Sequence, residues 1–172
     1  QKHGLFFNFV SDPCLKDTYS LNLKAIKECL KQNVPVNILT KQIWWALKDK
    51  IEDEFGFDVD KAKRLIAFGF TLTGHDELEP GCSPNNYRVI AMKHLHDAGF
   101  KTWASIEPII DFESSYRMIE ETLGSCDLYK IGLKSGGTYS VADAKAFIKN
   151  VMVSCEGSNS KVYLKDSLIK LT

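Results

Sequence analysis

The stretch LFFNFVSDPCL, residues 5–15, contains the pattern that decides the fold of this chain. Residues 5–10 form a short apolar run whose length and composition predict a buried strand. The run ends at Ser11, Asp12 and Pro13, which favour a turn and also carry groups that can hold a ligand. A buried strand followed at once by polar side chains is the unit that the rest of the sequence repeats.

Five more apolar runs rich in β-branched and aromatic residues follow, and successive runs begin 25 to 37 residues apart. Helical periodicity fills the intervals between them. Alternation of strands and helices at this spacing requires crossover connections, which favour a parallel sheet with helices outside it. The expected strands occupy residues 5–10, 35–39, 65–72, 102–107, 127–132 and 161–164.

The helices expected between these strands differ in how clearly their ends are marked. The first has an apolar face of Leu23, Ile26 and Leu30, and a weaker second helix is expected from Gln42 to about Glu54. Asp111 is expected to cap the fourth helix, and the fifth runs from Val141 to about Val153. The third helix, bounded by Pro84 and Gly99, has as its apolar positions Tyr87, Ile90, Ala91, Leu95 and Ala98.

These elements predict an α/β fold in a single domain, residues 1–172, in which residues 155–172 add an extra strand and a short helix. Two architectures fit: a closed or partial parallel (β/α) barrel and an open doubly wound sheet. Both bind ligands at the carboxyl ends of their strands. Because the chain begins at Gln1 with a strand almost at once, we expect it to be a fragment truncated at the N-terminus.

The strand ends carry polar and charged side chains. Turn and capping chemistry is a sufficient explanation for any one end, but in a barrel all the ends converge on one mouth. Hydroxyls, carboxylates and lysines without a histidine suit a zwitterionic or polyhydroxylated ligand better than a hydrolytic triad. The candidate binding residues are Ser11, Asp12, Lys41, Thr71, Thr73, Glu107 and Lys130.

Composition restricts the function less than the pattern does. Lys plus Arg and Asp plus Glu both number 22, so the overall charge does not point to nucleic acid or an anionic membrane. No apolar run approaches the ~18 residues that span a bilayer, and no signal peptide opens the chain, so we expect a cytoplasmic protein without membrane contact. The five cysteines are too widely spaced for a disulfide framework or a complete metal site.

Several other groups have an ordinary structural interpretation. His94 and His96 lie two apart on an expected helix, so they point to different faces and cannot share a metal. His3 and His75 are isolated in loops. The segment GGTYS, residues 136–140, lacks the surrounding sequence of a phosphate-binding loop, which favours a plain connection.

Five segments of the chain carry a resemblance to a known family, and they are FNFVSDPCL, VPVNILTK, FGFTLT, HDELEPGCSPNNYRVIAMKHLHDAGFKTWASIEPIID and DLYKIGLK. Taken in order, these segments resemble radical S-adenosylmethionine enzymes of the spore photoproduct lyase and DNA repair photolyase-like branch. The resemblance covers about residues 5–135 and rests on the order of the strand-end motifs. It implies a partial (β/α) barrel that binds S-adenosylmethionine and a [4Fe-4S] cluster and forms a 5′-deoxyadenosyl radical, which abstracts hydrogen from substrate.

The resemblance also implies which part of S-adenosylmethionine each candidate residue binds. Ser11 and Asp12 would bind the amino group of its methionine part. Lys41 would bind the carboxylate. Thr71 or Thr73 would bind the carboxylate or the ribose hydroxyls.

Glu107 and Lys130, at later strand ends, would face the cofactor or the substrate. The chain departs from the family at two points. The C-x3-C-x2-C loop that holds the cluster is absent, so its ligands are expected before Gln1 and this chain alone is expected to be inactive. Phe9 stands where spore photoproduct lyase has a reactive cysteine, so thymine-dimer repair is not expected.

The sequence does not identify the substrate of such a radical enzyme. Two further hypotheses about the function also stay open. One is a non-catalytic barrel module that has lost its cluster and binds a small molecule or a partner. The other is an unrelated (β/α) enzyme acting on a phosphorylated metabolite, with residues 136–140 as its phosphate site. A nucleic-acid partner follows only from family analogy, and an open strand edge in an incomplete barrel would favour a homo-oligomer.

Overall fold

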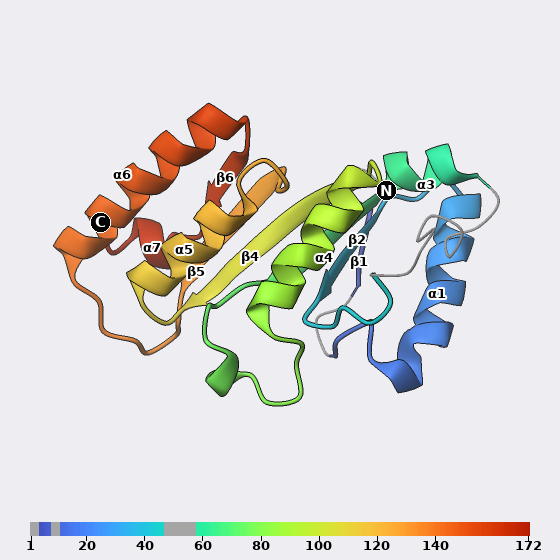
Figure 1. Ribbon diagram of the computed structural model, residues 1–172, viewed down its shortest axis with the longest axis horizontal. Coiled ribbons are helices and arrows are strands. Elements are labelled where there is room, and N and C mark those ends of the chain that lie inside the picture. The colour runs from blue at the N-terminus through green and yellow to red at the C-terminus, as the bar shows by residue number, and fades with distance from the viewer. Residues whose placement is uncertain (1–3, 8–10, 47–57) are drawn as a thin grey trace.

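The computed structural model describes residues 4–7, 11–46 and 58–172. Within these residues one sheet contains six strands, all parallel and ordered as in the chain (Figure 1). The sheet is not closed, since β1 and β6 are its two edges, and this agrees with a partial barrel. The strands are β1 (Leu5–Phe7), β2 (Val36–Thr40), β3 (Ile66–Thr71), β4 (Lys101–Ile109), β5 (Leu128–Leu133) and β6 (Lys161–Leu164).

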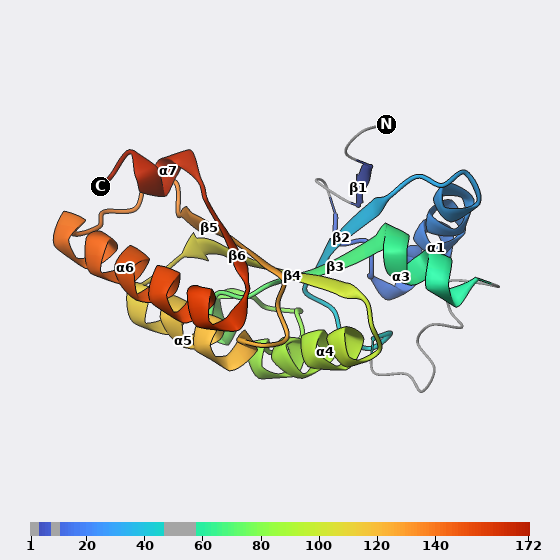
Figure 2. The same cartoon turned by 90° about the horizontal axis from the view of Figure 1, so that it is seen from above.

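Helices connect the strands and pack along one side of the sheet (Figure 2). We call the opposite side the concave face. A short 3₁₀ turn, η1 (Asp76–Leu78), precedes α4, and α7 (Asp166–Ile169) follows β6. The longer helices are α1 (Lys16–Lys31) against β2, α3 (Val59–Leu65) against β3, α4 (Asn85–Asp97) against β3 and β4, α5 (Phe112–Thr122) against β4, and α6 (Val141–Ser158) against β6.

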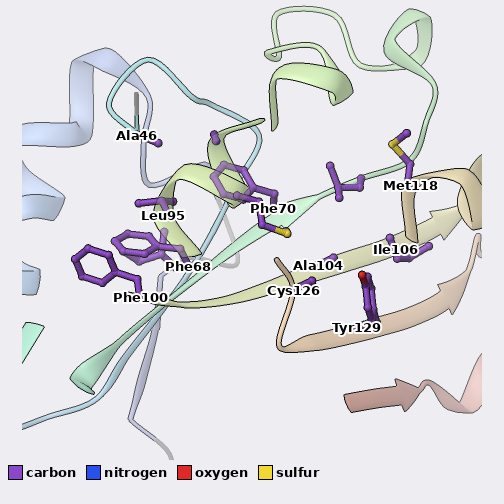
Figure 3. Close-up of a cluster of buried hydrophobic side chains, with 14 of the residues drawn as sticks. Ala46, Phe68, Phe70, Leu95, Phe100, Ala104, Ile106, Met118, Cys126 and Tyr129 are labelled. Atoms are coloured by element: carbon purple, nitrogen blue, oxygen red, sulfur yellow. The ribbon is translucent and has the colours of Figure 1, made fainter. Parts of the chain in front are cut away.

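The core lies between the sheet and the helices. Because side chains alternate along a strand, every second residue of β3 and β4 points toward the helices. Phe68, Phe70 and Ile106 on these strands are 0% exposed and belong to one buried cluster with Leu95 of α4 (Figure 3). Burial of each such side chain stabilises the fold by about 1.5–3 kcal/mol. The alternate residues face the concave side and are free to form a site.

The strands lie close to where the sequence predicts them, and residues 8–10 of the first expected strand fall outside the described residues. Asp111 caps α5 as predicted, since its Oδ1 accepts a hydrogen bond from the Ser114 N–H at 2.7 Å. The helices of the first, third, fourth and fifth intervals are also present. Helix α3 was not predicted, because it is short and buries only Ala62.

Two expectations about the helices are wrong. Residues 42–46 form a turn instead of the start of a helix, because the N–H groups of Gln42 and Ile43 donate to the hydroxyls of Thr40 and Ser83. The rest of that expected helix, residues 47–54, lies outside the described residues.

No helix in the described ranges is long and apolar enough to cross a membrane.

The buried face of α4 also differs from the prediction. Ala91 and Leu95 are buried as expected, but Tyr87 and Ile90 are 49% and 51% exposed. The helix instead turns Arg88 inward, where its side chain is 0% exposed. A buried guanidinium needs polar partners, and the partners of Arg88 lie in the candidate site described below.

Candidate functional site

Asp12 joins the turn after β1 to the end of β2. Its Oδ1 accepts hydrogen bonds from the Thr40 hydroxyl at 2.6 Å and from the Cys14 N–H at 2.8 Å. Its Oδ2 accepts one from the Lys41 N–H at 2.6 Å. An ionised carboxylate offers about four lone-pair directions. Asp12 therefore orders two strand ends and keeps one direction open for a cation. Ser11 beside it is exposed.

The Lys41 side chain points to a carboxylate outside the candidate set, Glu79. Lys41 Nζ lies 2.7 Å from Glu79 Oε1, and Arg88 Nη1 lies 2.7 Å from Glu79 Oε2. The Thr73 hydroxyl also donates to Oε2, at 3.1 Å. We call these four residues the Glu79 network.

The Glu79 network is buried and charged. The Glu79 side chain is 6% exposed, and that of Arg88 is 0% exposed. Burial alone would raise the pKa of Glu79, but the Lys41 hydrogen bond and the Arg88 charge outweigh it and hold the pKa below its usual value. The network therefore keeps an ionised carboxylate beside the carboxyl ends of β2 and β3.

Arg88 also fixes the backbone where β3 ends. Its Nη1 donates to the carbonyl of Thr71 at 2.9 Å, and its Nε donates to the carbonyl of Ser83 at 2.6 Å. The Thr73 N–H donates to Asn85 Oδ1 at 3.0 Å. The strand end that carries both candidate threonines is thus held by charge-assisted and buried hydrogen bonds. The sequence contains one signal for this network. Arg88 lies three positions before Ala91 and seven before Leu95, on the face of α4 that an apolar residue would be expected to occupy.

A cavity of about 730 Å³ opens on the concave face. Trp103 of β4 lies flat over Gly69, where an added Cβ would come within 2.2 Å of the indole. Lys130 Nζ of β5 lies 4.0 Å from the centroid of the Trp103 ring. The cavity is lined in part by Phe6, Leu39, Trp103, Ser105, Lys130 and Tyr163.

An ion pair forms part of the wall of this cavity. Lys165, just after β6, binds Glu107 of β4, and both side chains are partly exposed. They meet above Gly132 of β5, since a Cβ there would lie 2.9 Å from a Glu107 oxygen and 3.0 Å from Lys165. Glu107 is therefore already paired, whereas Lys130 has no carboxylate partner among the described residues. Burial, and then the charge of Lys165, lowers the pKa of Lys130.

Five of the seven candidate residues fall into two groups, and the exposed Ser11 belongs to neither. Asp12, Lys41 and Thr73 gather at the ends of β1, β2 and β3 beside Glu79. Glu107 and Lys130 line the cavity on the concave face. Thr71 stands between the groups. Its carbonyl is held by Arg88, and its position on β3 is in register with Ser105 of β4.

His75 is not isolated, although it looks so in the sequence. Its Nδ1 lies 2.7 Å from Glu77, and its Nε2 lies 2.5 Å from Asp111 and 3.0 Å from the Ser114 hydroxyl. Hydrogen bonds to Glu77 and then Asp111 raise the pKa of His75, which favours the imidazolium. Through these contacts His75 links the loop after β3 to Asp111 and Ser114 at the start of α5.

Burial makes the thiols of Cys14 and Cys126 poor nucleophiles. Cys14 is buried, and burial raises its thiol pKa far above the usual value. Burial also raises the pKa of Cys126 to about 12. No three His, Cys, Asp or Glu side chains within residues 4–7, 11–46 and 58–172 are placed to hold a metal ion.

The loop at residues 136–140 is closed by its own aromatic side chain. The Tyr139 hydroxyl donates to the carbonyl of Ile109 at 2.6 Å and accepts from the Lys134 N–H at 3.1 Å. The Gly137 N–H donates to the Lys134 carbonyl. A phosphate-binding loop needs free N–H groups. Two amides at this loop are already used, which weakens the phosphate-site interpretation.

Comparison with known proteins gives one informative likeness. No family model matches the chain, and no curated protein matches it. Among solved structures, the chain is similar to Streptococcus suis SuiB bound to S-adenosylmethionine, with a TM-score of 0.61 and 12% sequence identity. The match covers 87% of this chain and 37% of the SuiB chain, so this chain spans little more than a third of that length. The likeness shows that this chain shares its fold with part of that protein, and it does not extend to the photolyase-like branch.

Proposed function

We propose that this chain is the S-adenosylmethionine-binding part of a radical S-adenosylmethionine enzyme. The observation that carries the proposal is the fold shared with a protein that was solved with this cofactor bound. The chemistry of the strand ends supports it. Asp12 keeps an acceptor direction open, and Lys41 is a cation whose side chain is 34% exposed. Together they offer opposite charges to the two ends of an amino acid.

We assign Ser11 and Asp12 to the amino group of the cofactor and Lys41 to its carboxylate. Thr71 or Thr73 would hold the carboxylate or the ribose. The Glu79 network positions Lys41, because its short contact with Glu79 limits where the ammonium can lie. When bound and reduced by one electron, the cofactor would supply a carbon radical that takes hydrogen from a substrate.

The described residues do not fit the iron–sulfur cluster that such chemistry uses. No group of ligands among them is placed for a metal ion, and the buried thiols of Cys14 and Cys126 are protonated at neutral pH. Cluster ligands would therefore have to come from residues outside the described ranges. We infer the photolyase-like branch from the order of the strand-end motifs alone, without thymine-dimer repair, because Phe9 replaces the reactive cysteine.

Binding of the cofactor can be measured directly by isothermal titration calorimetry with S-adenosylmethionine. 5′-Methylthioadenosine is the matched ligand, since it keeps the nucleoside and lacks the amino and carboxylate groups. Lys41→Met should weaken S-adenosylmethionine binding about tenfold and leave 5′-methylthioadenosine unchanged, because only the former has a carboxylate to pair. Lys93→Met, an exposed lysine on α4, is the control variant.

Two results would contradict the proposal. Equal effects of Lys41→Met on both ligands would show that Lys41 does not bind the carboxylate. Absence of S-adenosylmethionine binding by the folded chain would favour a barrel module that binds another small molecule or a partner.

A further inference from the structure

The concave cavity contains a row of hydrogen-bond donors that the proposed cofactor assignments leave mostly unused. Thr71, Ser105, Lys130 and Tyr163 occupy successive positions across β3, β4, β5 and β6, because the strand register pairs each with the next. Neighbours in register point to the same face of a sheet. Three of the four line the cavity directly, and these are Ser105, Lys130 and Tyr163.

This row has an excess of positive charge. The charged side chains that line the cavity are Lys130, Lys165 and Glu107. Glu107 and Lys165 neutralise one another in an ion pair, which leaves one net positive charge. That charge belongs to Lys130, which has no carboxylate partner among the described residues and lies 4.0 Å from the centroid of the Trp103 ring.

The position of Lys130 is costly for a cation without an anion. Burial and the neighbouring Lys165 both disfavour its charged form, and the indole face offsets this only in part. The indole N–H of Trp103 is also buried without a hydrogen-bond partner in the described part of the chain. A negatively charged ligand group beside Lys130 would supply the missing counter-charge.

The rest of the cavity wall is apolar and aromatic. Phe6 lies 6.2 Å from Trp103 between ring centroids, and Leu39 and Leu128 complete this side. Tyr163, 55% exposed, stands at the edge strand. A cavity of this kind fits a ligand whose anionic group is attached to a flat or apolar body.

We propose that Lys130 and Ser105 form the binding site for the carboxylate or phosphate of an aromatic or apolar substrate, which lies in the concave cavity against Trp103. The assignment of this ligand as the substrate rests on the proposed function, whereas the anion site itself does not. Lys130 is thus assigned to the substrate, and the cofactor carboxylate is left to Lys41.

The proposal is tested by calorimetric titration of the whole chain with 2-naphthoate and with the neutral, nearly isosteric 2-naphthamide. A titration with naphthyl phosphate then shows whether the site binds a phosphate or a carboxylate more tightly. The anions should bind about tenfold more tightly than the amide. Lys130→Met should abolish this preference, and Lys130→Arg should retain it. Lys134→Met, an exposed lysine beyond the end of β5, should leave the preference within about twofold of the unchanged chain.

Ser105→Ala provides a second test that removes no charge, and it should weaken naphthoate by about threefold to tenfold through loss of one hydrogen bond. Equal affinity for acid and amide, or a preference that survives Lys130→Met in a chain that remains folded by circular dichroism, would overturn the anion site.

Competition with S-adenosylmethionine separates this proposal from the proposed function. Simultaneous binding of naphthoate and S-adenosylmethionine supports a substrate site. Mutual exclusion would assign Lys130 to the cofactor carboxylate and overturn the substrate assignment. Naphthoate binding that depends on Lys130, in a chain that does not bind S-adenosylmethionine, would refute the proposed function and leave the anion site intact.

Discussion

Replacement of Glu79 by glutamine removes the charge at the centre of the Glu79 network and keeps its shape. Arg88, 0% exposed, then lies buried without its counter-charge. Breaking a buried ion pair from one side costs about 3–5 kcal/mol. The amide oxygen of the new side chain can still accept from Thr73 or Arg88, so we expect a loss of about 3 kcal/mol, at the low end of this range. That is a large part of a total stability of about 5–15 kcal/mol.

The matched control is Lys41→Met, which removes the other cation of the same carboxylate. The Lys41 side chain is 34% exposed, and water screens its charge. We expect a loss of about 0–1 kcal/mol. Urea denaturation followed by circular dichroism measures both variants, and thermal denaturation should show a decrease of about 6–12 °C for Glu79→Gln.

The pH dependence gives this prediction a second readout. The pKa of Glu79 is lowered in the folded chain, so its contribution to stability is complete above its unfolded value near 4.5 and is lost as the pH falls through the folded pKa. Glu79→Gln should remove that part of the acid destabilisation. A Glu79→Gln chain within about 1 kcal/mol of the parent, or a Lys41→Met loss of the same size as the Glu79→Gln loss, would refute the reasoning.

Three further predictions follow from other parts of the structure. Titration followed by NMR should give the imidazole of His75 a pKa above its usual value of 6.5. The contribution of His75 to stability should be complete below pH 6.5 and should be lost as the pH rises through the folded pKa. A normal pKa would contradict the contacts with Glu77 and Asp111. Gly69→Ala should displace Trp103, change its fluorescence and destabilise the chain by about 1–3 kcal/mol, and an unchanged spectrum would argue against the close packing. In the native chain Cys82 should react with a thiol reagent faster than Cys126, whose thiol is buried with a pKa raised to about 12; equal rates, followed by mass spectrometry, would exclude this burial.

The sequence predicts the sheet well because each strand is a short run rich in apolar residues between helical patterns, and burial against the helices requires apolar side chains at least at alternate positions of each run. It predicts less about the face of a helix when one polar residue must be inside. In α4 the apolar pattern favours Tyr87 and Ile90, but Arg88 is turned inward by Glu79, which lies nine positions before it in the chain. Such a pair is visible only once the loop and the helix are brought together.

The candidate site was predictable to a similar extent. Strand-end chemistry indicates Asp12 and Lys41, because parallel strands bring their carboxyl ends to one edge. It does not indicate Trp103 or Ser105, which lie within β4 and look like ordinary strand residues. Their role depends on which face of the strand is left uncovered by helices, and the register of the sheet decides that.

The ion pair between Glu107 and Lys165 joins residues from strands that are not neighbours. Two strand spacings amount to about 9–10 Å, which two long side chains can bridge only when the strand between them presents no side chain. Gly132 is that opening. The ion pair therefore ties the end of β6 to β4 across β5, and any side chain at position 132 would stand between the two charged groups.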